Sequence, residues 1–330
     1  TEFGEDLLAT WRESEKPQSS CPDPGRSLVE RWDYIELCCG PNTPLLDACM
    51  GEGLVCGPRI DILLHSVWDI RSGRLIEWIV HLIFSGRVFY VHCGAPCTTF
   101  SIARCPKERS KTFPMGKPGC SDKVREGNVL LFRTLVVLYA VFLAGLDPTR
   151  RYTVGSHEHP ASAYSWLVRQ VRVLFGHEGC GIVPLSYCQY GAPHRKHTKF
   201  CYVYAYFLTQ FERVCRGGHS HVVLRGALTT LASQYPPGLC KEFARAIAHA
   251  RRIAGPPPVE EPDRAERRGA LESMVFNDVL LSAPWRAIMK ASCAGLKGRR
   301  LHVNITEVRA QLKSIESRPF DATYMTKQVY

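Results

Sequence analysis

The middle of the chain alternates between short apolar runs and longer stretches in which apolar residues recur every three or four positions. Short apolar runs are typical of buried strands, and the longer spacing is typical of helices with one buried face. Strands are therefore predicted at Trp32–Leu37, Arg59–Leu64, Val88–His92, Tyr152–Ser156, Ile182–Tyr187 and Lys199–Tyr206. Helices are predicted from Pro44 onward and over Leu75–Phe84, Val129–Leu146, Ala161–Phe175 and Cys240–Ile253.

This alternation predicts an α/β fold with a doubly wound, mostly parallel sheet whose two faces are covered by helices. The last two predicted strands are separated by a segment with a Gly-Ala-Pro turn, so they are expected to form a hairpin at one edge of the sheet. The run Val129–Leu146 is almost long enough to span a bilayer, but it contains Arg133. We interpret this run as a buried helix, with a transmembrane span as the alternative.

The two ends of the chain differ from its middle. Residues 1–30 are polar and broken by three prolines, which predicts a loosely ordered leader. Residues 31–254 contain all the predicted strands and form the expected main domain. The run Gly255–Pro258 and the acidic residues after it predict a stiff linker over residues 255–263, followed by a small, mixed, basic C-terminal extension at 264–330.

The chain carries 42 Lys and Arg against 31 Asp and Glu, which gives a formal net charge of +11 at pH 7 and a pI near 9.0. An excess of this size favours a polyanionic partner, and nucleic acid is the natural candidate. The alternative is that the charge only keeps the protein soluble. The pattern indicates no membrane and no obligate protein partner.

Fifteen cysteines would suggest a disulfide framework in a short secreted chain. This chain is long, the number is odd and no secretory signal is recognisable, so reduced thiols in the nucleus or cytoplasm are expected. No C-x-x-C pair occurs, and the close pairs Cys38-Cys39 and Cys93 with Cys97 lack the spacing of a zinc site. The spacing therefore predicts no metal.

The segment from Gly94 to Ser101 contains Cys97 directly after a predicted strand. Ligands of open α/β sheets bind outside the carboxyl ends of the strands. The loop that follows runs to about Glu126 and is rich in Lys and Arg, and long loops inside compact domains are usually functional. Because nearby cations favour the thiolate, Cys97 is the candidate nucleophile, with an inert buried thiol as the alternative.

The residues around Cys97 also match a known pattern. Gly94-Ala95-Pro96-Cys97 followed by Phe100-Ser101 resembles the G-x-P-C-Q-x-F-S motif of the C5-cytosine DNA methyltransferases, with Thr98 in place of Gln. Further segments between about residues 32 and 206 resemble the family's other motifs in the same order: Ile35–Gly40, Asp61-Ile62, Asp69-Ile70, Glu158-His159-Pro160 and Tyr190–Lys196. Ordered matches near the ends of predicted strands are more specific than any single motif. The resemblance implies a Rossmann-like class I methyltransferase domain over residues 31–254.

The resemblance implies S-adenosylmethionine as the cofactor. The first strand-to-helix turn would hold its methionine part, Asp61 its ribose and Asp69 its adenine. The full set of implied cofactor residues is Glu36, Cys38, Cys39, Gly40, Asn42, Thr43, Asp61, Ile62, Asp69, Ile70 and Pro96. The family has more glycine after the position of Gly40, whereas this chain has Pro41-Asn42-Thr43.

The resemblance also implies a mechanism on a cytosine that is flipped out of a duplex or already single-stranded. Cys97 would attack C6 so that C5 accepts the methyl group, and Glu158 would hold the amino group and N3. Lys196 or Arg195 would grip the O2 side, where a preorganised donor stabilises charge. In ungapped register His194 falls on the family's Gln, Lys196 on its first Arg and Thr198 on its second, whereas a shift by one uses Arg195. The sequence leaves both registers open.

The basic loop from Ser101 to Glu126 is expected to close over the base and to contact phosphates. Its candidate nucleic-acid-binding residues are Arg104, Lys107, Arg109, Lys111, Lys117 and Lys123. Only about fifteen residues separate Tyr206 from His221, where the family usually inserts its target-recognition domain. The target sequence is left open, and DNA is the expected partner, with RNA as an alternative.

Two other functions fit the same residues: a catalytically inactive nucleic-acid-binding protein with this fold, and an RNA cytosine methyltransferase. Single motifs also have plainer explanations. Glu158 would be an ion-paired surface carboxylate, Asp69 an N-cap, and the residues from Arg195 to Lys199 a solvated basic patch. Spacing suggests that Tyr235–Leu239, with the helix after it, is the family's last motif, which packs on the cofactor pocket.

Overall fold

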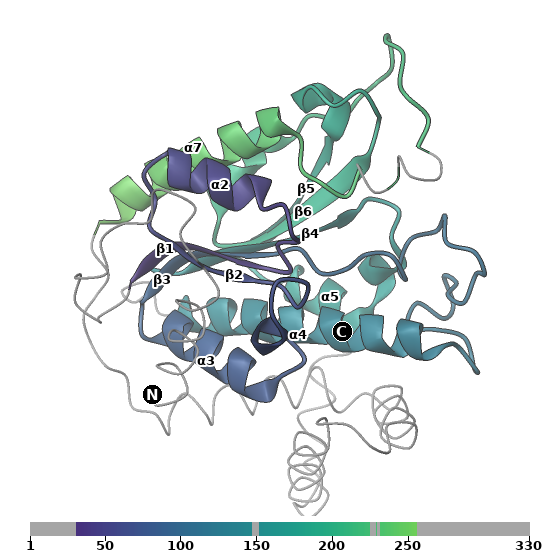
Figure 1. Cartoon of the computed structure of the whole chain (residues 1–330), viewed down its shortest axis with the longest axis horizontal. Helices are drawn as coiled ribbons and strands as arrows, with labels where there is room; N and C mark the ends of the chain where they lie inside the picture. Colours follow the sequence, from purple (N-terminus) through teal and green to yellow (C-terminus); the bar gives the residue numbers. More distant parts are fainter. Residues whose placement is uncertain (1–30, 147–151, 225–228, 230–231, 256–330) are drawn as a thin grey trace, which may run out of the picture. The chain divides into compact units, whose positions relative to one another are not determined.

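The computed structural model describes residues 31–146, 152–224, 229 and 232–255. Within these residues the chain forms a six-stranded sheet with helices on both faces (Figure 1). The predicted leader at residues 1–30, the linker beyond Gly255 and the C-terminal extension lie outside the described residues.

The sheet combines a parallel half with an antiparallel hairpin. Strands β1 to β4 pair in parallel, and β6 runs antiparallel to both β4 and β5. The strands are β1 (Trp32–Leu37), β2 (Cys56–Ile60), β3 (Val88–Cys93), β4 (Val154–Pro160), β5 (Cys180–Ser186) and β6 (His197–Val203), in the order β2-β1-β3-β4-β6-β5. The predicted Rossmann-like α/β fold is confirmed, and so is the hairpin, with β5 at the edge of the sheet.

The chain changes direction across the sheet between β1 and β3. From β1 it moves outward to β2, and it then returns to the other side of β1 to form β3. The carboxyl ends of β1 and β3 therefore border a crevice, which is where open α/β sheets bind ligands. The turn after β1 and the Cys97 loop after β3 both begin at this crevice.

Helices cover both faces of the sheet (Figure 1). One face carries α2 (Pro44–Gly51) and α7 (Pro237–Ala254), and the other carries α3 (Gly73–Phe84), α4 (Asp122–Ala144) and α5 (Arg169–Leu174). Both α2 and α7 have a proline in their first turn, where a backbone N–H has no partner within the helix. Local sequence thus fixes where these two helices begin.

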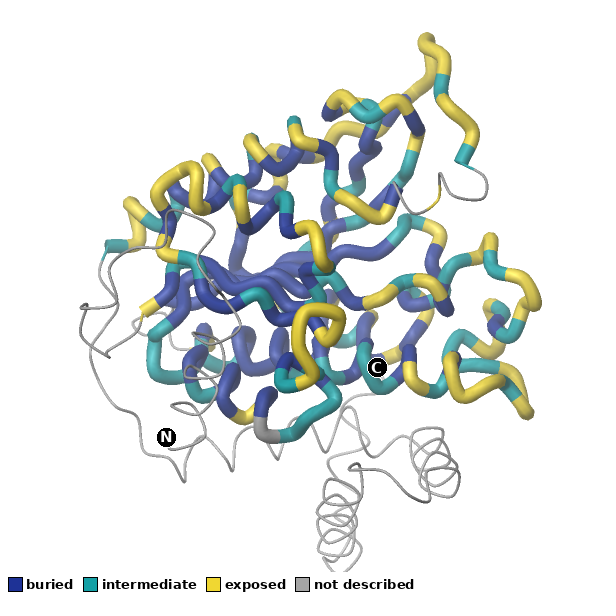
Figure 2. Tube along the Cα trace, in the orientation of Figure 1, coloured by how far each residue is buried: buried dark blue, intermediate teal, exposed yellow. Residues whose placement is uncertain are grey.

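The central strands β1 and β3 are buried on both faces, which explains their nearly continuous apolar sequence (Figure 2). Tyr34 on β1 stacks on Tyr90 of β3 with ring centroids 5.9 Å apart, and Trp32 packs edge-on against Trp78 of α3 at 5.5 Å. The Tyr90 hydroxyl donates to Ser156 Oγ on β4 at 2.6 Å. The Tyr34 hydroxyl donates to the Glu36 carboxyl group at 3.0 Å. Both buried tyrosine hydroxyls therefore have a hydrogen-bond partner, as burial requires.

Helix α4 has 23 residues and lies in the middle of its face. Its length and composition alone would let it cross a membrane, but 67% of its apolar stretch is buried in the structure. It packs against α3, β4 and β6, and the Arg133 guanidinium donates to the carbonyl of Arg71 at 3.2 Å. The structure thus agrees with the interpretation of this run as a buried helix.

The predicted strand Arg59–Leu64 is wrong over most of its length. The strand is Cys56–Ile60, and the chain turns at Asp61. The Asp61 carboxylate accepts the N–H groups of Gly40 and Leu63, each at 2.8 Å. A side chain that bonds to its own neighbouring backbone favours a turn over further strand, which explains the early end.

The helix predicted over Ala161–Phe175 is broken into two pieces. A 3₁₀ turn at Tyr164–Leu167 is followed by α5, and Val168 between them has an extended backbone. Helix α4 in turn begins at Asp122, ahead of the apolar run that predicted it. Apolar spacing locates the buried faces of helices but not their polar first turns.

Candidate active site

The carboxyl ends of β1 and β3 approach each other closely. The Gly94 N–H donates to the carbonyl of Leu37 at 3.0 Å. A Cβ at position 94 would lie 3.4 Å from the Cys38 carbonyl oxygen and 3.5 Å from the Tyr235 hydroxyl. A Cβ would therefore make ordinary van der Waals contacts here, and the Gly94 N–H to Leu37 hydrogen bond is what joins the turn after β1 to the Cys97 loop.

Cys97 is half-buried in a hydrogen-bonded turn after β3. Its carbonyl accepts the N–H groups of Phe100 and Ser101 at 2.9 and 3.0 Å. His159 on β4 also holds this loop, because its Nε2 donates to the carbonyl of Ala95 at 2.9 Å. The thiol is thus presented from a fixed backbone.

Glu158 on β4 is buried among polar side chains. Lys196 Nζ lies 3.4 Å from Glu158 Oε1 and donates to the Tyr187 hydroxyl at 3.2 Å. The Tyr187 hydroxyl donates to the same carboxylate oxygen at 3.5 Å, and the Thr198 hydroxyl also contacts that oxygen. The antiparallel register explains this meeting, because the start of β6 lies opposite the end of β4. The interpretation of Glu158 as a surface carboxylate is therefore wrong.

The Cys97 thiol shares the electrostatic environment of this group. Burial raises the pKa of Cys97 above its ordinary value, the Glu158 carboxylate raises it further, and the Lys196 ammonium lowers it. The expectation that the basic loop would favour the thiolate is therefore wrong. Lys196 is the cation that acts on this thiol, and desolvation outweighs it.

Alkylation of Cys97 by iodoacetamide is expected to be slow at pH 7 and to accelerate about tenfold per pH unit to beyond pH 9, because the thiolate is the nucleophile. Lys196→Met removes the neighbouring cation and is expected to slow alkylation at pH 8. Lys111→Met, in the exposed part of the loop, serves as the control. Mass spectrometry of the Cys97 peptide separates this thiol from the others. A wild-type rate that levels off below pH 8 would contradict the buried environment.

Arg195 and Lys196 have different neighbours. Lys196 contacts Glu158, whereas Arg195 is exposed and acts on Cys215. The pKa of Cys215 is lowered first by the Gly217 N–H and, less strongly, by the Arg195 guanidinium. The structure brings Lys196, in the ungapped register, and not Arg195, to the candidate site.

Arg109 holds the loop together instead of facing solvent as a phosphate contact would. It is 2% exposed, and its guanidinium donates to the carbonyls of Thr99, Pro114 and Val124 at 2.7 to 3.0 Å. It also donates to the Asn128 side chain on α4 at 2.7 Å. Burial lowers its pKa to about 10, so Arg109 stays charged at neutral pH. The prediction of Arg109 as a nucleic-acid-binding residue is therefore wrong.

Replacing Arg109 with Met is expected to lower the free energy of unfolding by about 3 kcal/mol, because three buried carbonyls lose their donor. Lys107→Met, an exposed position in the same loop, is expected to change it by less than about 0.5 kcal/mol. Urea denaturation of both variants makes the comparison. An Arg109→Met variant with full stability but weaker nucleic-acid binding would restore the phosphate role.

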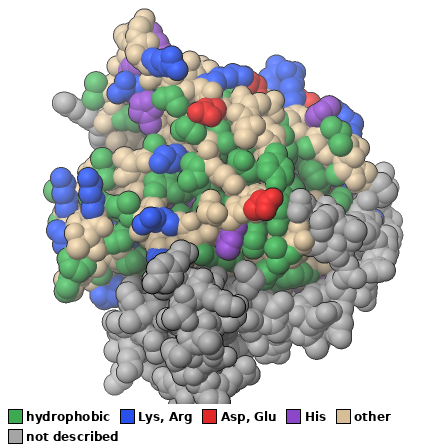
Figure 3. All heavy atoms as spheres, turned by 180° about the vertical axis from the view of Figure 1, so that it is seen from behind, with side chains coloured by type: hydrophobic (Ala, Val, Ile, Leu, Met, Phe, Trp, Pro, Cys, Tyr) green, Lys and Arg blue, Asp and Glu red, His purple; other side chains and the backbone are tan. Residues whose placement is uncertain are grey.

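The remaining basic residues of the loop are more accessible. Arg104 pairs with Glu108 at 2.7 Å. The exposed lysines are Lys107, Lys111, Lys117 and Lys123. Lys and Arg side chains gather on the side of the molecule where this loop lies (Figure 3). The role of these lysines as phosphate contacts stays a prediction.

Glu36 on β1 lies in the core rather than at a surface that a cofactor would contact. It is 2% exposed, and its carboxyl group accepts the Tyr34 hydroxyl at 3.0 Å. Burial raises its pKa to about 8, against the opposing effect of the hydrogen bond from Tyr34. Glu36 is therefore mostly uncharged at pH 7, and the structure does not support direct contact between its carboxyl group and a ligand.

The turn from Cys38 to Thr43 wraps around the acid that follows β2. Cys38 and Gly40 have φ angles of +57° and +73°, and the Gly40 N–H donates to Asp61 Oδ2. Thr43 is buried, and its hydroxyl donates to Asp47 Oδ1 at 3.1 Å. Among the other predicted cofactor residues, Cys39 and Ile70 are buried, and Asn42, Ile62 and Pro96 are exposed.

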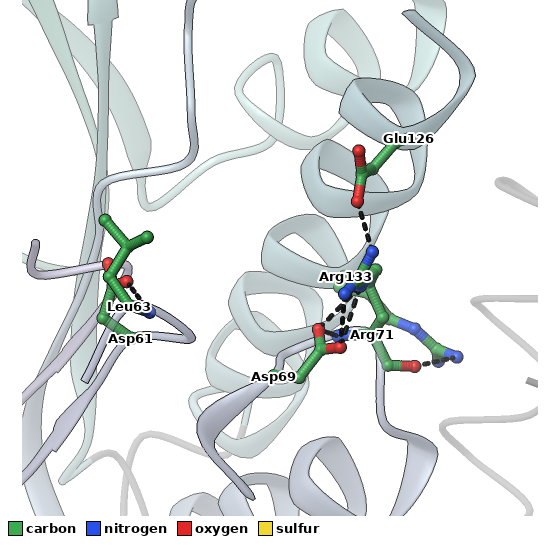
Figure 4. A network of polar contacts seen from close by, with 6 residues as sticks. All are labelled: Asp61, Leu63, Asp69, Arg71, Glu126 and Arg133. Carbon is green, nitrogen blue, oxygen red and sulfur yellow. Dashed lines mark hydrogen bonds and ion pairs between the residues drawn. The ribbon is translucent and has the colours of Figure 1, made fainter. Parts of the chain in front are cut away.

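Asp69 is engaged by a neighbouring arginine (Figure 4). Its carboxylate accepts the backbone N–H and Nε of Arg71 at 2.8 to 2.9 Å, and Arg71 also pairs with Glu126 on α4. The N-cap of α3 is Ser72, so Asp69 is not the cap of that helix. Arg71 thus occupies the carboxylate that the resemblance assigns to adenine.

The acids beside the turn create a negative field. Burial is the largest cause that raises the pKa of the Cys38 thiol. The charges of Asp61 and Asp69 raise this pKa further, which places these groups near one another. A Cβ at Gly40 would meet nothing within 4 Å, so the turn leaves open space. The carboxylates of Asp61 and Asp69 suit the cationic sulfonium of S-adenosylmethionine in charge, while Asp69 would share its carboxylate with Arg71.

Three polar groups of the site, Tyr187, Thr198 and Tyr235, were not among the catalytic or cofactor-binding residues predicted from the sequence. The Tyr235 hydroxyl lies 2.8 Å from His92 Nε2 and acts on Tyr187 and Glu158 electrostatically. Tyr187 ends a predicted strand, and Tyr235 opens the segment that resembles the last motif. Both tyrosines lie at the edge of a predicted strand or motif. Because a buried tyrosine hydroxyl needs a polar partner, their positions could have indicated that they contact the polar groups of the site.

No family model and no curated protein matches the chain. Among solved structures, the chain is similar to the crystal structure of the Dnmt2 methyltransferase of S. pombe, with 12% identity and a TM-score of 0.32. The similarity covers 60% of this chain and 61% of that chain, which is less than two thirds of its length. A likeness at this level carries no argument about function, and the fold assignment rests on the sheet topology.

Proposed function

We propose that this protein transfers a methyl group from S-adenosylmethionine to C5 of cytosine, with DNA as the substrate and Cys97 as the nucleophile. The observation that carries the proposal is the placement of Cys97 in the field of the buried Glu158–Lys196 pair at the carboxyl ends of the strands. The ordered sequence motifs that contain these three residues support the same assignment.

Cys97 begins the reaction by losing its proton to solvent, and the thiolate then adds its sulfur to C6 of the cytosine. The electron pair of the C5–C6 bond then becomes available at C5, which makes that carbon nucleophilic. Glu158 would hold N3 and the exocyclic amino group, and Lys196 would stabilise the charge that develops toward O2. Such preorganised groups in a water-poor site are worth several kcal/mol.

When bound, S-adenosylmethionine supplies an electrophilic methyl group on a cationic sulfur. The turn from Cys38 to Thr43 and the Asp61 carboxylate would hold it at the crevice between β1 and β3. The C5 proton then passes to solvent, the C6–S bond breaks and its electron pair returns to Cys97. The exposed lysines of the loop after Cys97 would bind phosphates while the base occupies the site.

The experiment that tests this function is covalent trapping. The protein is incubated with methyl-labelled S-adenosylmethionine and a DNA duplex that contains 5-fluorocytosine. Fluorine at C5 cannot leave as a proton does, so the adduct with Cys97 should survive denaturation. A labelled adduct that is lost in Cys97→Ser and kept in Cys105→Ser, an exposed thiol of the same loop, would support the nucleophile, the cofactor and the base together.

A second candidate is a nucleic-acid-binding protein that does not turn over. The observation that favours it is the internal use of both cofactor acids, since Asp61 bonds to two backbone N–H groups and Asp69 to Arg71. Absence of an adduct on duplex DNA, single-stranded DNA and RNA, together with salt-sensitive binding to the same molecules, would overturn the enzyme and favour this binder. An adduct on RNA alone would correct the substrate.

A further inference from the structure

Four side chains that can bind a metal meet beside the end of β5, apart from the group around Cys97. They are Cys188, Cys215, His219 and His221, and one ligand atom from each lies within 4.8 Å of the others. The sequence contains no C-x-x-C pair, and its spacing therefore predicted no metal. Cys215, His219 and His221 lie close together along the chain, but Cys188 is remote and only the fold brings it to them.

Two distances from Cys215 are close to those of a tetrahedral zinc ion. Cys215 Sγ lies 3.5 Å from His221 Nε2 and 3.9 Å from His219 Nε2. Ordinary Zn–S and Zn–N bonds at a tetrahedral angle separate sulfur from nitrogen by about 3.6 Å. The two imidazole rings have centroids 4.4 Å apart and planes tilted by 54°, so they are adjacent without stacking face to face. We propose that these four residues bind one zinc ion as a closed, structural site.

The backbone around Cys215 is shaped for such a site. Gly217 and Gly218 have φ angles of +94° and +86°, a pair of left-handed residues that turns the chain back toward Cys215. The Gly217 N–H donates to Cys215 Sγ at 3.4 Å, and hydrogen bonds of this kind orient and stabilise metal-bound ligands. The Cys215 N–H in turn donates to Ser186 Oγ at the end of β5, which anchors the ligand to the sheet.

A cross-link through a metal ion would stabilise the segment from Arg213 to Val223. It projects from the molecule beyond β5 and is largely exposed (Figures 1 and 2). Val214, Val222 and Val223 are exposed. The Val222 N–H donates to the carbonyl of Pro193 at 2.8 Å, which connects the segment to the loop before β6. A zinc ion supplies the folding free energy that so little buried apolar surface cannot.

The chemistry of the ligands selects zinc. A tetrahedral set of two sulfurs and two nitrogens is typical of zinc among the biological metals. Two thiolates also cancel the charge of the ion, which suits a site with the Arg195 guanidinium beside Cys215. Because Cys188 directly follows Tyr187, the ion would also fix the turn that carries a partner of Glu158. The zinc site does not depend on the proposed methyl transfer.

Zinc content of the full chain tests the proposal directly. The protein is purified under reducing conditions without a metal-affinity step, and zinc is measured by plasma mass spectrometry. About one zinc per chain is expected in the wild type, falling to below about a tenth in Cys215→Ser because a closed site needs all four ligands. Cys180→Ser, at the start of β5, is the control and is expected to keep its zinc.

Cobalt binding keeps the proposal testable if Cys215→Ser does not fold. Co²⁺ added to the metal-free wild type is expected to give the thiolate-to-cobalt charge-transfer absorption of a tetrahedral site. Cys188→His retains a ligand and is expected to bind Co²⁺ with about half of that absorption, since one of two thiolates remains. A wild type that binds neither metal, or that forms a Cys188–Cys215 disulfide under the same reducing conditions, would overturn the proposal.

Discussion

Glu158→Gln is expected to slow formation of the Cys97 adduct on 5-fluorocytosine by about 100- to 1,000-fold, the usual cost of removing one preorganised group at a reacting centre. The substitution keeps the size of the side chain and an acceptor for the Thr198 hydroxyl, but it removes the charge that pairs with Lys196. Single-turnover trapping at saturating S-adenosylmethionine measures the rate.

Glu178→Gln is the matched control for this experiment, because Glu178 is an exposed carboxylate that precedes β5. It is expected to trap the base at the wild-type rate. If Glu158→Gln also trapped at the wild-type rate, the buried carboxylate would serve only to hold Lys196 and the hairpin in place.

Three buried histidines are expected to make the protein labile to acid. Burial lowers the pKa of His92, His157 and His159 to about 3, from 6.5 in an unfolded chain. Between these values the unfolded chain binds protons that the folded chain does not, so the free energy of unfolding falls as the pH falls below 6.5. The three groups together contribute up to about 4 kcal/mol per pH unit.

Glu36 acts in the opposite sense. Burial raises its pKa to about 8, so the folded chain keeps a proton that the unfolded chain has released above pH 4.5. The free energy of unfolding therefore falls as the pH rises toward 8, by about 1.4 kcal/mol per pH unit. Stability is expected to be greatest near pH 6.5, and Glu36→Gln is expected to remove the decline above it.

Urea denaturation at several pH values between 5 and 8 measures both effects. Below pH 6.5, His157→Asn is expected to reduce the change in the free energy of unfolding with pH by about 1.4 kcal/mol per pH unit. The reason is that the unfolded variant binds one proton fewer than the unfolded wild type. His249→Asn, an exposed position on α7, is expected to leave the slope unchanged. Equal slopes for the wild type and His157→Asn would show that His157 is protonated alike in both states.

The sequence predicted the α/β class, the hairpin and the position of Cys97 at the end of a strand. These features depend on apolar runs and on turn residues, which act locally and are visible in a single chain. The start of α2 and the burial of α4 were predicted for the same reason.

Which neighbour each side chain faces could not be predicted in the same way. Arg109 lies in a run of basic residues that looks solvated, yet its guanidinium is enclosed by three carbonyls from separate segments. Lys196 and Arg195 are both basic, and only their neighbours in the folded chain, Glu158 for one and Cys215 for the other, separate them. Long-range pairing of this kind is a property of the packed chain and not of a local pattern.

The antiparallel hairpin also sets the order in which the candidate site can be built. Strand β4 reaches its one parallel neighbour, β3, only through a long crossover, whereas β5 and β6 are joined by a short connection and pair along their whole length. Local hairpins close quickly, and non-local strand pairing is slow. A growing chain that ends after β4 would already contain Cys97 and Glu158 but not Lys196. The candidate site would therefore be completed late, when the finished hairpin packs on β4 and brings Lys196 to Glu158.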